Sequence, residues 1–392
     1  MVLNFGVRLV TRFPALNFAA NTMSFFIFIA LSVWTVLHGF VFWRLSSLPV
    51  VAGFISNKVL WSLACAFWVS LPASRWLAKL GFSGTGTVVE WIAMTWVGLL
   101  FLLFTCFLVV DCVTLGGFLL SQWVLQLRSV GAAIAVVLAV VAVFQGTRAP
   151  VVNEQEVKLP GLPRDRDGLR IVFVSDLHLG GQIGRTWLHS LEGQISALKP
   201  DLIAIGGDLI DHDTVRVQGM IAELRTLRAP LGVWAVLGNH DTFGDPRESS
   251  RIMQEAGFRV LHDESAIVAP GLRIAGVDDL GIRGRSGPVE PAIRDALRLV
   301  RQGQEGCVYL SHTPEGVKEA AEAGAGLMLC GHTHGGQIWP FNFLVKLRYP
   351  ELVGRFRHDP MTLIISRGSG TWGPRMRLWL PGEILLITLR AP

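Results

Sequence analysis

The first 150 residues of this chain are far more apolar than the remainder, and this asymmetry limits what the chain can fold into. The longest apolar stretches cover residues 23–43, 59–77, 88–110 and 130–144. A helix that spans a bilayer needs about 20 apolar residues. The first and third stretches reach that length, whereas the fourth is shorter and the second contains Pro72. We therefore predict a transmembrane region of about four helices within residues 1–146.

The charge of the chain is divided in the same way. Residues 1–150 contain eight Lys or Arg and two Asp or Glu, a net charge of +6, whereas residues 151–392 carry a net charge of −1. The basic pI therefore comes from residues that flank apolar stretches, as in membrane proteins, and does not indicate a nucleic-acid surface. We expect the lipid bilayer as a partner and no nucleic acid as a stable partner.

The distribution of Lys and Arg over the short loops favours an N-terminus inside the cell. With four spans, the inner side carries Arg8, Arg12, Arg75, Lys79, Arg148 and Lys158, and the outer side carries Arg44, Lys58 and Arg128. The small-residue pair Ala19-Ala20 precedes the first apolar stretch, which argues against a cleaved signal peptide. The prediction is a multi-pass protein whose second half is cytoplasmic, and one span more or fewer would reverse this side.

Two ionisable residues, His38 and Asp111, lie in or beside the predicted spans. A charged group within a membrane is a candidate for function. The alternatives are that Asp111 lies at the interface, just past the end of the third span, and that His38 forms a hydrogen bond to a neighbouring helix.

The second half of the chain has the pattern of an α/β domain. Residues 147–168 are rich in Pro, Glu, Lys, Arg and Asp, which is typical of a linker. Strands are then expected over residues 169–175, 202–205, 233–237, 266–268, 273–277, 308–310, 327–329, 362–365 and 384–389. Helices are expected over residues 186–198, 215–227, 246–256, 291–301 and 314–323. The alternation predicts an α/β domain over residues 169–392.

Five of the expected strands end in short polar segments. These segments are Ser175-Asp176-Leu177-His178, Gly206-Gly207-Asp208, Gly238-Asn239-His240-Asp241, Ser311-His312 and Gly331-His332-Thr333-His334. Sites in open α/β sheets form beyond the carboxyl ends of the strands, so these side chains would meet in one place. A single Asp after a strand is more often a helix N-cap, which is our interpretation of Asp211 unless it supports a ligand. Five such segments together are difficult to assign to structural roles.

The combination Asp-x-His, Gly-Asp, Gly-Asn-His-Asp, Ser-His and Gly-His-x-His, over residues 169–390, resembles the calcineurin-like metallophosphoesterase superfamily. The segments GHTHGGQIWPF and SRGSGTWGPRMRLWLPGEILLITL resemble its membrane-associated bacterial phosphodiesterases, a branch that includes one type of UDP-2,3-diacylglucosamine pyrophosphohydrolase. The Pro-Gly-Glu sequence at 381–383 departs from the Pro-Pro-Glu of that branch. The resemblance implies a β-sandwich flanked by helices, in the order α/β/β/α, and a location in a bacterial inner membrane.

The resemblance also implies a centre with two divalent metal ions. Asp176, His178 and His334 would bind the first ion, Asn239, His312 and His332 would bind the second, and Asp208 would bridge both. One carboxylate can hold two cations that lie about 3.5–4 Å apart. Mixed Asp, Asn and His ligands suit Mn²⁺, which we favour, and also Fe, Zn²⁺ or Mg²⁺, whereas the lack of thiolates argues against a structural zinc site.

The same resemblance assigns the chemistry. The metal ions would activate a water molecule and neutralise phosphoryl charge. His240 would act as general acid or transition-state stabiliser, and Asp241 would orient it. Candidates for substrate contact are Arg367, Arg375 and Arg377 in a Gly-rich loop, and Trp339 and Phe341 in the apolar run after His334. For the arginines, a solvated loop or a contact with anionic lipid is the alternative.

The function predicted from the sequence is a membrane-anchored, metal-dependent phosphoesterase that hydrolyses a phosphodiester or pyrophosphate in a lipid-linked substrate. The alternative substrates are soluble nucleotides or cyclic dinucleotides. Two other classes are a transporter or sensor built on the spans, and a non-catalytic scaffold. The complete ligand set argues against the scaffold.

Overall fold

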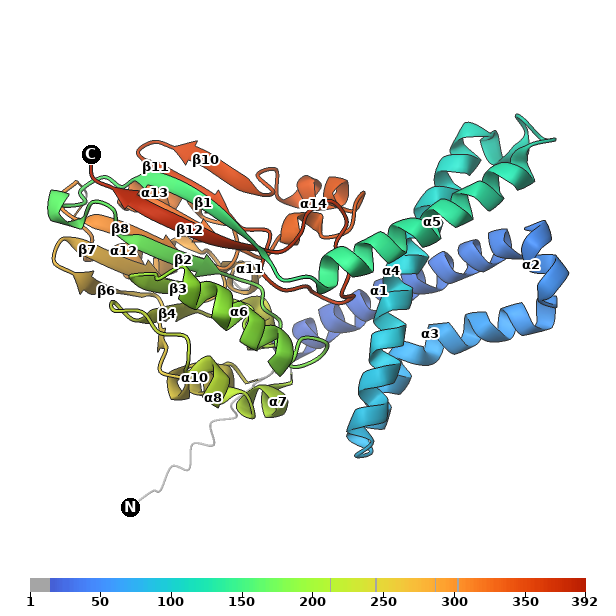
Figure 1. The fold of residues 1–392 in the computed structure, drawn as a ribbon, viewed down its shortest axis with the longest axis horizontal. Coiled ribbons are helices and arrows are strands. Elements are labelled where there is room, and N and C mark those ends of the chain that lie inside the picture. The colour runs from blue at the N-terminus through green and yellow to red at the C-terminus, as the bar shows by residue number, and fades with distance from the viewer. Residues whose placement is uncertain (1–14, 212, 244, 286, 302) are drawn as a thin grey trace, which may run out of the picture.

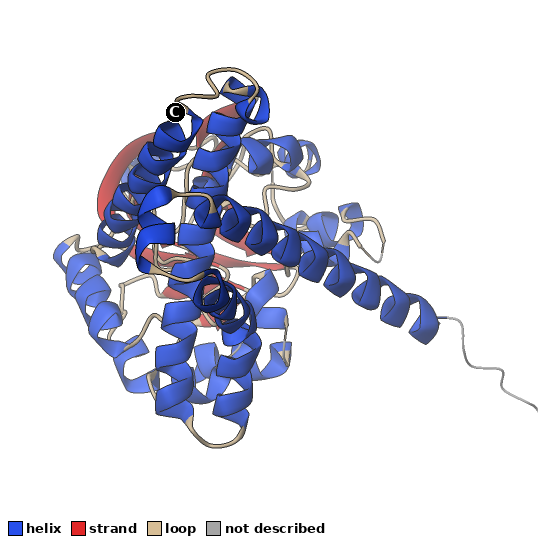
Figure 2. Ribbon diagram, turned by 90° about the vertical axis from the view of Figure 1, so that its right-hand side faces the viewer, coloured by secondary structure: helices blue, strands red, loops and turns tan. Residues whose placement is uncertain are grey.

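The computed structural model describes residues 15–392, apart from residues 212, 244, 286 and 302. Figure 1 shows a helical part formed by the first third of the chain, which lies against one end of an α/β part formed by the remainder. Figure 2 shows the strands confined to the α/β part, with helices outside them.

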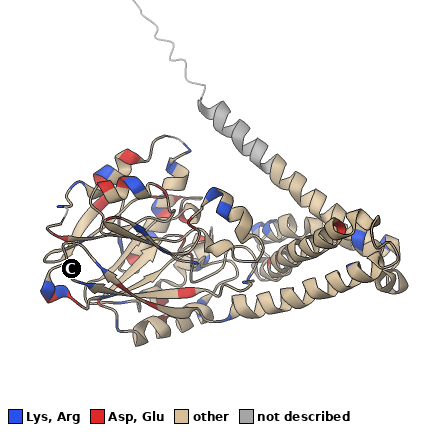
Figure 3. Ribbon diagram, turned by 90° about the horizontal axis from the view of Figure 1, so that it is seen from above, with Lys and Arg blue, Asp and Glu red and all other residues tan. Residues whose placement is uncertain are grey.

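The helical part consists of α1 (Ala15–Ser46), α2 (Pro49–Phe54), α3 (Asn57–Lys79), α4 (Ser83–Val113), η1 (Leu115–Gly117) and α5 (Val124–Thr147). Helix α1 leads away from the α/β part, α3 returns, α4 leads away again and α5 returns (Figure 1). Helix α4 packs against α1, α3 and α5. Many apolar side chains nevertheless face outward, including Val137 and Val140 of α5. Figure 3 shows charged residues gathered in the α/β part, while most of the helical part is uncharged.

Three of the described helices are long and apolar enough to cross a membrane, and the predicted count of four spans is therefore wrong. The three candidate spans are Phe28–Ser46, Gly84–Val113 and Val124–Thr147. The second predicted stretch does form a helix, α3, but this helix includes Lys58, Arg75 and Lys79 and has Pro72 in its interior. These polar residues lower its mean hydropathy, so the apolar run within it is too short to qualify by composition.

The ionisable residues of the helical part are paired. The interface interpretation placed Asp111 just past the end of the third span, but Asp111 lies inside α4. Its carboxylate oxygens lie 2.6 Å from Arg44 Nη2 and 2.7 Å from Arg128 Nη2. Trp96 Nε1 donates to His38 Nε2 (2.9 Å), so the hydrogen bond expected between His38 and a neighbouring helix is present. Both groups therefore hold helices together.

Two six-stranded mixed sheets form the centre of the α/β part. The first has the order β1-β12-β2-β3-β4-β5, and its strands are β1 (Val151–Lys158), β12 (Glu383–Arg390), β2 (Arg170–Val174), β3 (Leu202–Gly206), β4 (Val233–Val236) and β5 (Arg259–Val260). The second has the order β10-β11-β9-β8-β7-β6, and its strands are β10 (Gly354–His358), β11 (Met361–Ile365), β9 (Leu327–Cys330), β8 (Gly306–Leu310), β7 (Leu272–Gly276) and β6 (Glu264–Ala269). Strands β2 to β5 are parallel, and so are β7, β8, β9 and β11.

The layers follow the order α/β/β/α that was predicted. The longer flanking helices are α6 (Arg185–Ala197), α10 (Pro246–Glu255), α12 (Glu290–Leu297), α13 (Val317–Glu322) and α14 (Asn342–Arg348). Short turns of helix are η2 (Arg164–Arg166), α7 (Thr214–Gln218), α8 (Ile221–Leu224), α9 (Asn239–Thr242), α11 (Leu280–Arg283) and η3 (His334–Gly336). One core lies between the sheets and includes Phe173 of β2 and Ile274 of β7. A second packs β2 to β4 against α6 and α10, and a third packs β7 to β9 against α12 and α13.

Two local predictions differ from the structure. The helix expected over 215–227 is divided into α7 and α8, and Gly219 is the C-cap residue at the end of α7. The segment expected to be a linker, 147–168, contains β1, an edge strand that pairs with β12 along its whole length. Only Val157 of β1 is buried. An edge strand with so few buried residues has the polar composition of a linker, which is why the sequence did not predict it as a strand.

The helical part is packed on the loop between β11 and β12. Met376 and Leu378 of this loop are buried in the same apolar cluster as residues of α1, α4 and α5. Arg377 N donates to Ala142 O (2.8 Å), and Trp379 N donates to Gln145 Oε1 (2.9 Å). These contacts link the membrane helices directly to the α/β part, in addition to the peptide connection after α5.

We predict that Asp111→Ala destabilises the helical part, because it leaves the side chains of Arg44 and Arg128 without their carboxylate. Loss of one partner from a buried ion pair costs about 3–5 kcal/mol. Thermal unfolding of the full chain in detergent measures the effect. The neighbouring exposed residue provides a control, since Cys112→Ala should change the unfolding free energy by less than about 0.5 kcal/mol. Equal melting of the two variants would contradict a stabilising role for the pair.

Candidate metal centre

The five polar segments meet at one edge of the two sheets. They follow the carboxyl ends of β2, β3 and β4 in the first sheet and of β8 and β9 in the second. These strands run parallel within each sheet, so their ends lie together. The structure therefore brings together all seven residues predicted as metal ligands, although their spacing in the chain reaches 158 residues from Asp176 to His334.

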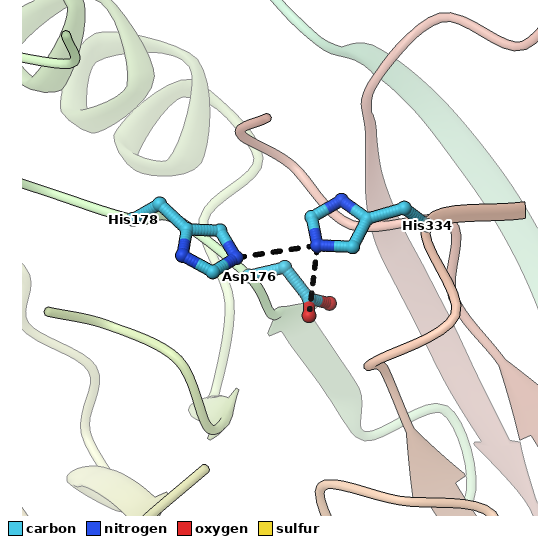
Figure 4. Close-up of side chains that lie close together, drawn as sticks. All are labelled: Asp176, His178 and His334. Carbon is cyan, nitrogen blue, oxygen red and sulfur yellow. Dashed lines mark hydrogen bonds and ion pairs between the residues drawn. The ribbon is translucent and has the colours of Figure 1, made fainter. Parts of the chain in front are cut away.

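One group of side chains consists of Asp176, His178 and His334 (Figure 4). His178 Nε2 lies 3.2 Å from His334 Nε2, and His334 Nε2 lies 3.5 Å from Asp176 Oδ1. All three side chains are buried. Two imidazole nitrogens and a carboxylate oxygen therefore face one another in a space of the size that a metal ion needs.

A second group consists of Asn239, His312 and His332. Asn239 Oδ1 lies 3.1 Å from His312 Nε2 and 3.0 Å from His332 Nδ1, and the two imidazole nitrogens lie 3.3 Å apart. His312 Nδ1 lies 2.8 Å from Gly206 O, so this nitrogen donates its proton to the carbonyl oxygen. This leaves Nε2 facing the other ligands.

Asp208 lies between the two groups. Its Oδ2 lies 3.2 Å from His312 Nε2 of the second group and 3.7 Å from His178 Nε2 of the first. Its Oδ1 accepts a hydrogen bond from His240 N (2.8 Å). This is the position that a carboxylate shared by two cations requires.

The backbone at this site is strained. Asp176, His178, Asp208, His332 and His334 all have positive φ angles, between 49° and 70°. Such conformations cost about 1–3 kcal/mol each for residues other than glycine, and they persist where a functional arrangement demands them. Five of the seven predicted ligands are in this state, all of them Asp or His, the residue types that most often adopt it after glycine and asparagine.

Glycines allow the ligands to approach closely. A Cβ atom at Gly238 would lie 2.2 Å from Asp208 Oδ1, and one at Gly331 would lie 2.4 Å from Asp176 Oδ2. Both distances are far below van der Waals contact, so only glycine fits at these two strand ends.

Burial keeps most of the imidazoles uncharged. It lowers the pKa of His178 to about 4, and burial together with the neighbouring His312 lowers the pKa of His332 to about 3. Burial also lowers the pKa of His334 well below its usual value. A neutral imidazole is the form that binds a metal ion. Burial raises the pKa of Asp208, but the charge and hydrogen bond of His312 outweigh it, so this carboxyl remains ionised.

The residues present fit a pair of divalent cations. Around His312 Nε2 lie a carboxylate oxygen, an amide oxygen and another imidazole nitrogen, all of which can accept. Acceptors that face each other in a buried site require a shared cation or proton between them. The oxygen and nitrogen donor set matches Mn²⁺, Fe or Zn²⁺.

The partner of His240 differs from the predicted one. Asp211 Oδ1 lies 2.9 Å from His240 Nδ1, so Asp211 and not Asp241 orients this imidazole. Asp241 instead accepts from the backbone N–H groups of Gly238 (2.9 Å) and Ile210 (2.9 Å), and it holds the ends of β3 and β4 together. The sequence placed Asp211 near the site but left its role open. Both carboxylates lie close to the site in sequence, and only the folded loops show which of them contacts His240.

The five predicted substrate contacts are not equivalent. Arg377 is fully buried, and its guanidinium donates to Gly370 O (2.6 Å) and Arg367 O (2.7 Å), so it holds the loop together. Its Nη2 also lies 3.5 Å from Nδ1 of the predicted ligand His334. Arg367 forms an ion pair with Glu383 (3.2 Å). Arg375 Nη1 donates to Gln182 O (3.4 Å). These pairings give Arg377 and Arg367 structural partners within the protein. An arginine loop that supports a fold looks the same in sequence as one that binds phosphate.

The aromatic candidates differ as well. Phe341 lines a cavity of 480 Å³ that opens on the site, whereas Trp339, which is half exposed, does not line it. Two further residues of this cavity were not predicted. Tyr349 Oη lies 3.1 Å from His332 Nε2, and the ring of Trp372 contacts the ring of His240 edge-on at 6.0 Å. Trp372 belongs to the segment SRGSGTWGPRMRLWLPGEILLITL, whereas no motif marks Tyr349, and only the fold brings both to the centre.

Comparison with known proteins agrees with this geometry. Residues 169–336 match the family model for calcineurin-like phosphoesterases. The chain is 30% identical to a Danio rerio protein described as a transmembrane protein with metallophosphoesterase domain, over 84% of this chain and 77% of that protein. It is 30% identical to a metallophosphoesterase of Aquifex aeolicus, over 61% of this chain and 91% of that protein. It is 29% identical to a metallophosphoesterase of Helicobacter pylori, over 63% of this chain and 65% of that protein.

The similarity to the Danio rerio protein extends beyond the α/β part. Residues 169–392 are too few to account for 84% of the chain, so part of the helical region is included. This relative is named as a transmembrane protein, and the chain described here has three helices able to span a membrane. Both observations support membrane association.

We predict that Mn²⁺ raises the melting temperature of metal-stripped protein, because an ion that binds only the folded state stabilises it by about 2.7 kcal/mol at one hundred times its Kd. Asp208→Ala should abolish this rise, whatever the melting temperature of the variant itself. Asp165→Ala, which removes a carboxylate that is 70% exposed, should keep it. Calorimetry on the three proteins checks the prediction, and a metal-independent melting of the unaltered chain would refute it.

Proposed function

The chain belongs to the calcineurin-like phosphoesterase family, and from this premise we propose that it is a membrane-anchored phosphoesterase that uses two divalent metal ions to hydrolyse a phosphodiester or a pyrophosphate. One observation carries the proposal. Asp208 lies between two groups of buried ligands, within 3.2 Å of His312 Nε2 and 3.7 Å of His178 Nε2. This geometry supports a shared carboxylate between two cations.

Each predicted ligand has a role in the proposal. Asp176, His178 and His334 would hold one ion, Asn239, His312 and His332 would hold the other, and Asp208 would be shared by both. The ions, with Mn²⁺ as our first choice, would supply Lewis-acid activation of water and charge neutralisation at the phosphoryl group. The chain contributes the rigidity of the ligands. His332 N donates to Asp176 Oδ1 (3.0 Å), Ser175 Oγ donates to Asp176 Oδ2 (2.6 Å), and Tyr349 supports the ring of His332.

We propose His240 as the proton donor to the leaving group. It lines the 480 Å³ cavity beside the ligands, so a bound phosphoester would be within its reach. Burial lowers the pKa of His240, but the hydrogen bond to Asp211 and the charge of Asp208 outweigh burial and raise it above the usual value. A raised pKa favours the protonated imidazole, the form that a general acid requires. Asp211 fixes which nitrogen faces the cavity.

We propose a lipid-linked substrate, in keeping with the resemblance to the membrane-associated bacterial phosphodiesterases. The support is the position of the site, since the cavity that contains the ligands is also lined by residues of α1 and α4. Soluble nucleotides and cyclic dinucleotides, the other substrates considered from the sequence, have no comparable feature in their favour among the described residues.

We further propose a bacterial inner-membrane location, with the phosphoesterase domain on the cytoplasmic side. The division into a membrane region (1–146), a connecting segment (147–168) and a catalytic domain (169–392) belongs to this proposal, with β1 of the connecting segment joined to the catalytic sheet. The support for the side is the excess of Lys and Arg on the predicted inner loops.

The proposed activity is tested on the purified full chain. After chelation it should lack activity on a chromogenic phosphodiester, and Mn²⁺ should restore turnover. Asp208→Ala should show no turnover above background, because neither ion would keep its shared ligand, whereas Asp165→Ala should remain active. Turnover by Asp208→Ala equal to that of the unaltered chain would exclude this site as the source of activity.

The role of His240 is tested separately. His240→Asn should lower kcat by about 10²–10⁴-fold for a phosphodiester with a poor leaving group, because general acid catalysis contributes about this much. The loss should be much smaller for a p-nitrophenyl ester, whose leaving group needs no proton. An equal loss for both substrates would show that His240 does not donate a proton to the leaving group.

A further inference from the structure

The apolar half of the cavity at the metal centre is built by the membrane helices. On one side, the cavity of 480 Å³ is lined by candidate ligands, among them His178, Asp208 and His334. On the other side it is lined by Trp34 and Leu37 of α1 and by Val97, Gly98, Leu100 and Phe101 of α4. All six belong to candidate spans. The volume lies within the range of small-molecule sites, about 300–1,000 Å³.

The wall contributed by the helices is rigidly joined to the α/β part. The ring of Phe101 packs edge-on against the ring of Phe341 at 5.8 Å. Ile338, at the start of the same loop, is 7% exposed and belongs to the apolar cluster of α1, α4 and α5. At Gly98 a Cβ atom would lie 2.3 Å from Met376 Sδ, so α4 touches the loop that follows β11. The apolar wall is therefore a fixed part of the site.

A second cavity, of 320 Å³, adjoins the first and reaches the centre at His178. The two cavities share Trp34, Val97, His178, Trp372 and Pro374. The lining of the second is more polar and includes Arg75 of α3, Glu90 of α4, Gln182, Asp211 and Thr371. Among the described residues, the buried Oε1 of Gln182 and Oγ1 of Thr371 have no hydrogen-bond partner. These atoms are available for hydrogen bonds to a polar group or to water in this cavity.

We propose that α1 and α4 are substrate-binding elements. The substrate is a lipid whose hydrocarbon chain occupies the 480 Å³ cavity, whose scissile phosphorus lies at the candidate metal centre, and whose polar group occupies the 320 Å³ cavity. This inference rests on the proposed function and specifies its substrate class as an amphiphile with groups on both sides of phosphorus. Two cavities that meet at His178 fit a phosphodiester or a pyrophosphate, whereas a monoester would leave one of them unused.

The position of the apolar cavity favours a lipid over a soluble apolar molecule. Its helical wall consists of residues from Phe28–Ser46 and Gly84–Val113, the segments able to cross a membrane. A hydrocarbon chain would reach these residues from the bilayer without crossing water, and each buried CH₂ group contributes about 0.8 kcal/mol. The membrane region would then serve as half of the binding site as well as an anchor.

The experiment measures kcat/KM for methyl, butyl, hexyl and octyl p-nitrophenyl phosphates, below their micellar concentrations, with the full chain in lipid nanodiscs and Mn²⁺. All four esters release the same chromophore, so they differ only in the alkyl group. We expect kcat/KM to rise about fourfold for each CH₂ group added, the factor that corresponds to the free energy of burying it. The same rate for methyl and octyl esters would overturn the inference.

Variants of the wall locate the effect. Leu37→Trp should fill the cavity and lower the octyl-to-methyl ratio of kcat/KM towards one. Phe101→Ala should lower it less, since it removes one apolar contact. The control is Leu31→Trp, because Leu31 lies on the same helix, is 48% exposed and does not line the cavity. An unchanged ratio in a Leu37→Trp protein that still melts at a higher temperature with Mn²⁺ would overturn the inference.

A binding measurement removes the dependence on catalysis. Metal-stripped protein in nanodiscs should bind octyl phosphate more tightly than butyl phosphate in calorimetry, with a negative heat-capacity change from apolar burial. Leu37→Trp should remove the difference. The two levels of the proposal fail separately. If Mn²⁺ produced no turnover of any of the four esters, the proposed function would fail, whereas turnover without any chain-length dependence would overturn only the lipid-binding role of α1 and α4.

Discussion

The buried carboxylate of Asp208 is the interaction on which the rest of the site depends. Its backbone oxygen accepts from His178 N (3.0 Å), its Oδ1 accepts from His240 N (2.8 Å), and its Oδ2 faces His312 Nε2 at 3.2 Å. Asp208, in the loop after β3, therefore contacts the segments after β2, β4 and β8, which come from both sheets. An ionised carboxylate is stable in such a buried place only when positive charge or donors surround it. The nearby imidazoles and the N–H groups meet part of that need, and bound cations would meet the rest.

This demand explains why the chain accepts local strain at the same place. Five predicted ligands, Asp208 among them, have positive φ angles, and Gly238 and Gly331 leave no room for a Cβ atom. Each such feature costs stability by itself. The surrounding structure compensates with three apolar cores and with the hydrogen bonds that Asp241 accepts from the backbone of Gly238 and Ile210. As a result, the ligands are rigid and are held in place before metal ions bind. This favours a fixed coordination geometry.

The contact between the helical part and the α/β part depends on a second buried charge. Burial lowers the pKa of Arg377 to about 10, so its guanidinium remains protonated, and it donates to several carbonyl oxygens of its own loop and of His334. The loop is thereby held in a shape that presents Met376 and Leu378 to α1, α4 and α5. The same residue thus connects the segment of a predicted ligand to the membrane helices, which explains why these helices reach the cavity at the centre.

The sequence by itself determined the class of the fold, the alternation of strands and helices, and the five polar segments that meet at the centre, while the resemblance to the family singled out seven ligands among them. These follow from local properties, since apolar periodicity marks each element and a polar segment at a strand end has to lie at the edge of the sheet. Only the tertiary structure decided that Asp211 and not Asp241 orients His240, that Arg377 is buried in its loop, and that Tyr349 and Trp372 join the site. It also decided that β1 lies in a sheet and that α1 and α4 line the cavity. These relations join residues that lie far apart in the chain, and a pattern of neighbouring residues carries no information about which distant surface they will contact.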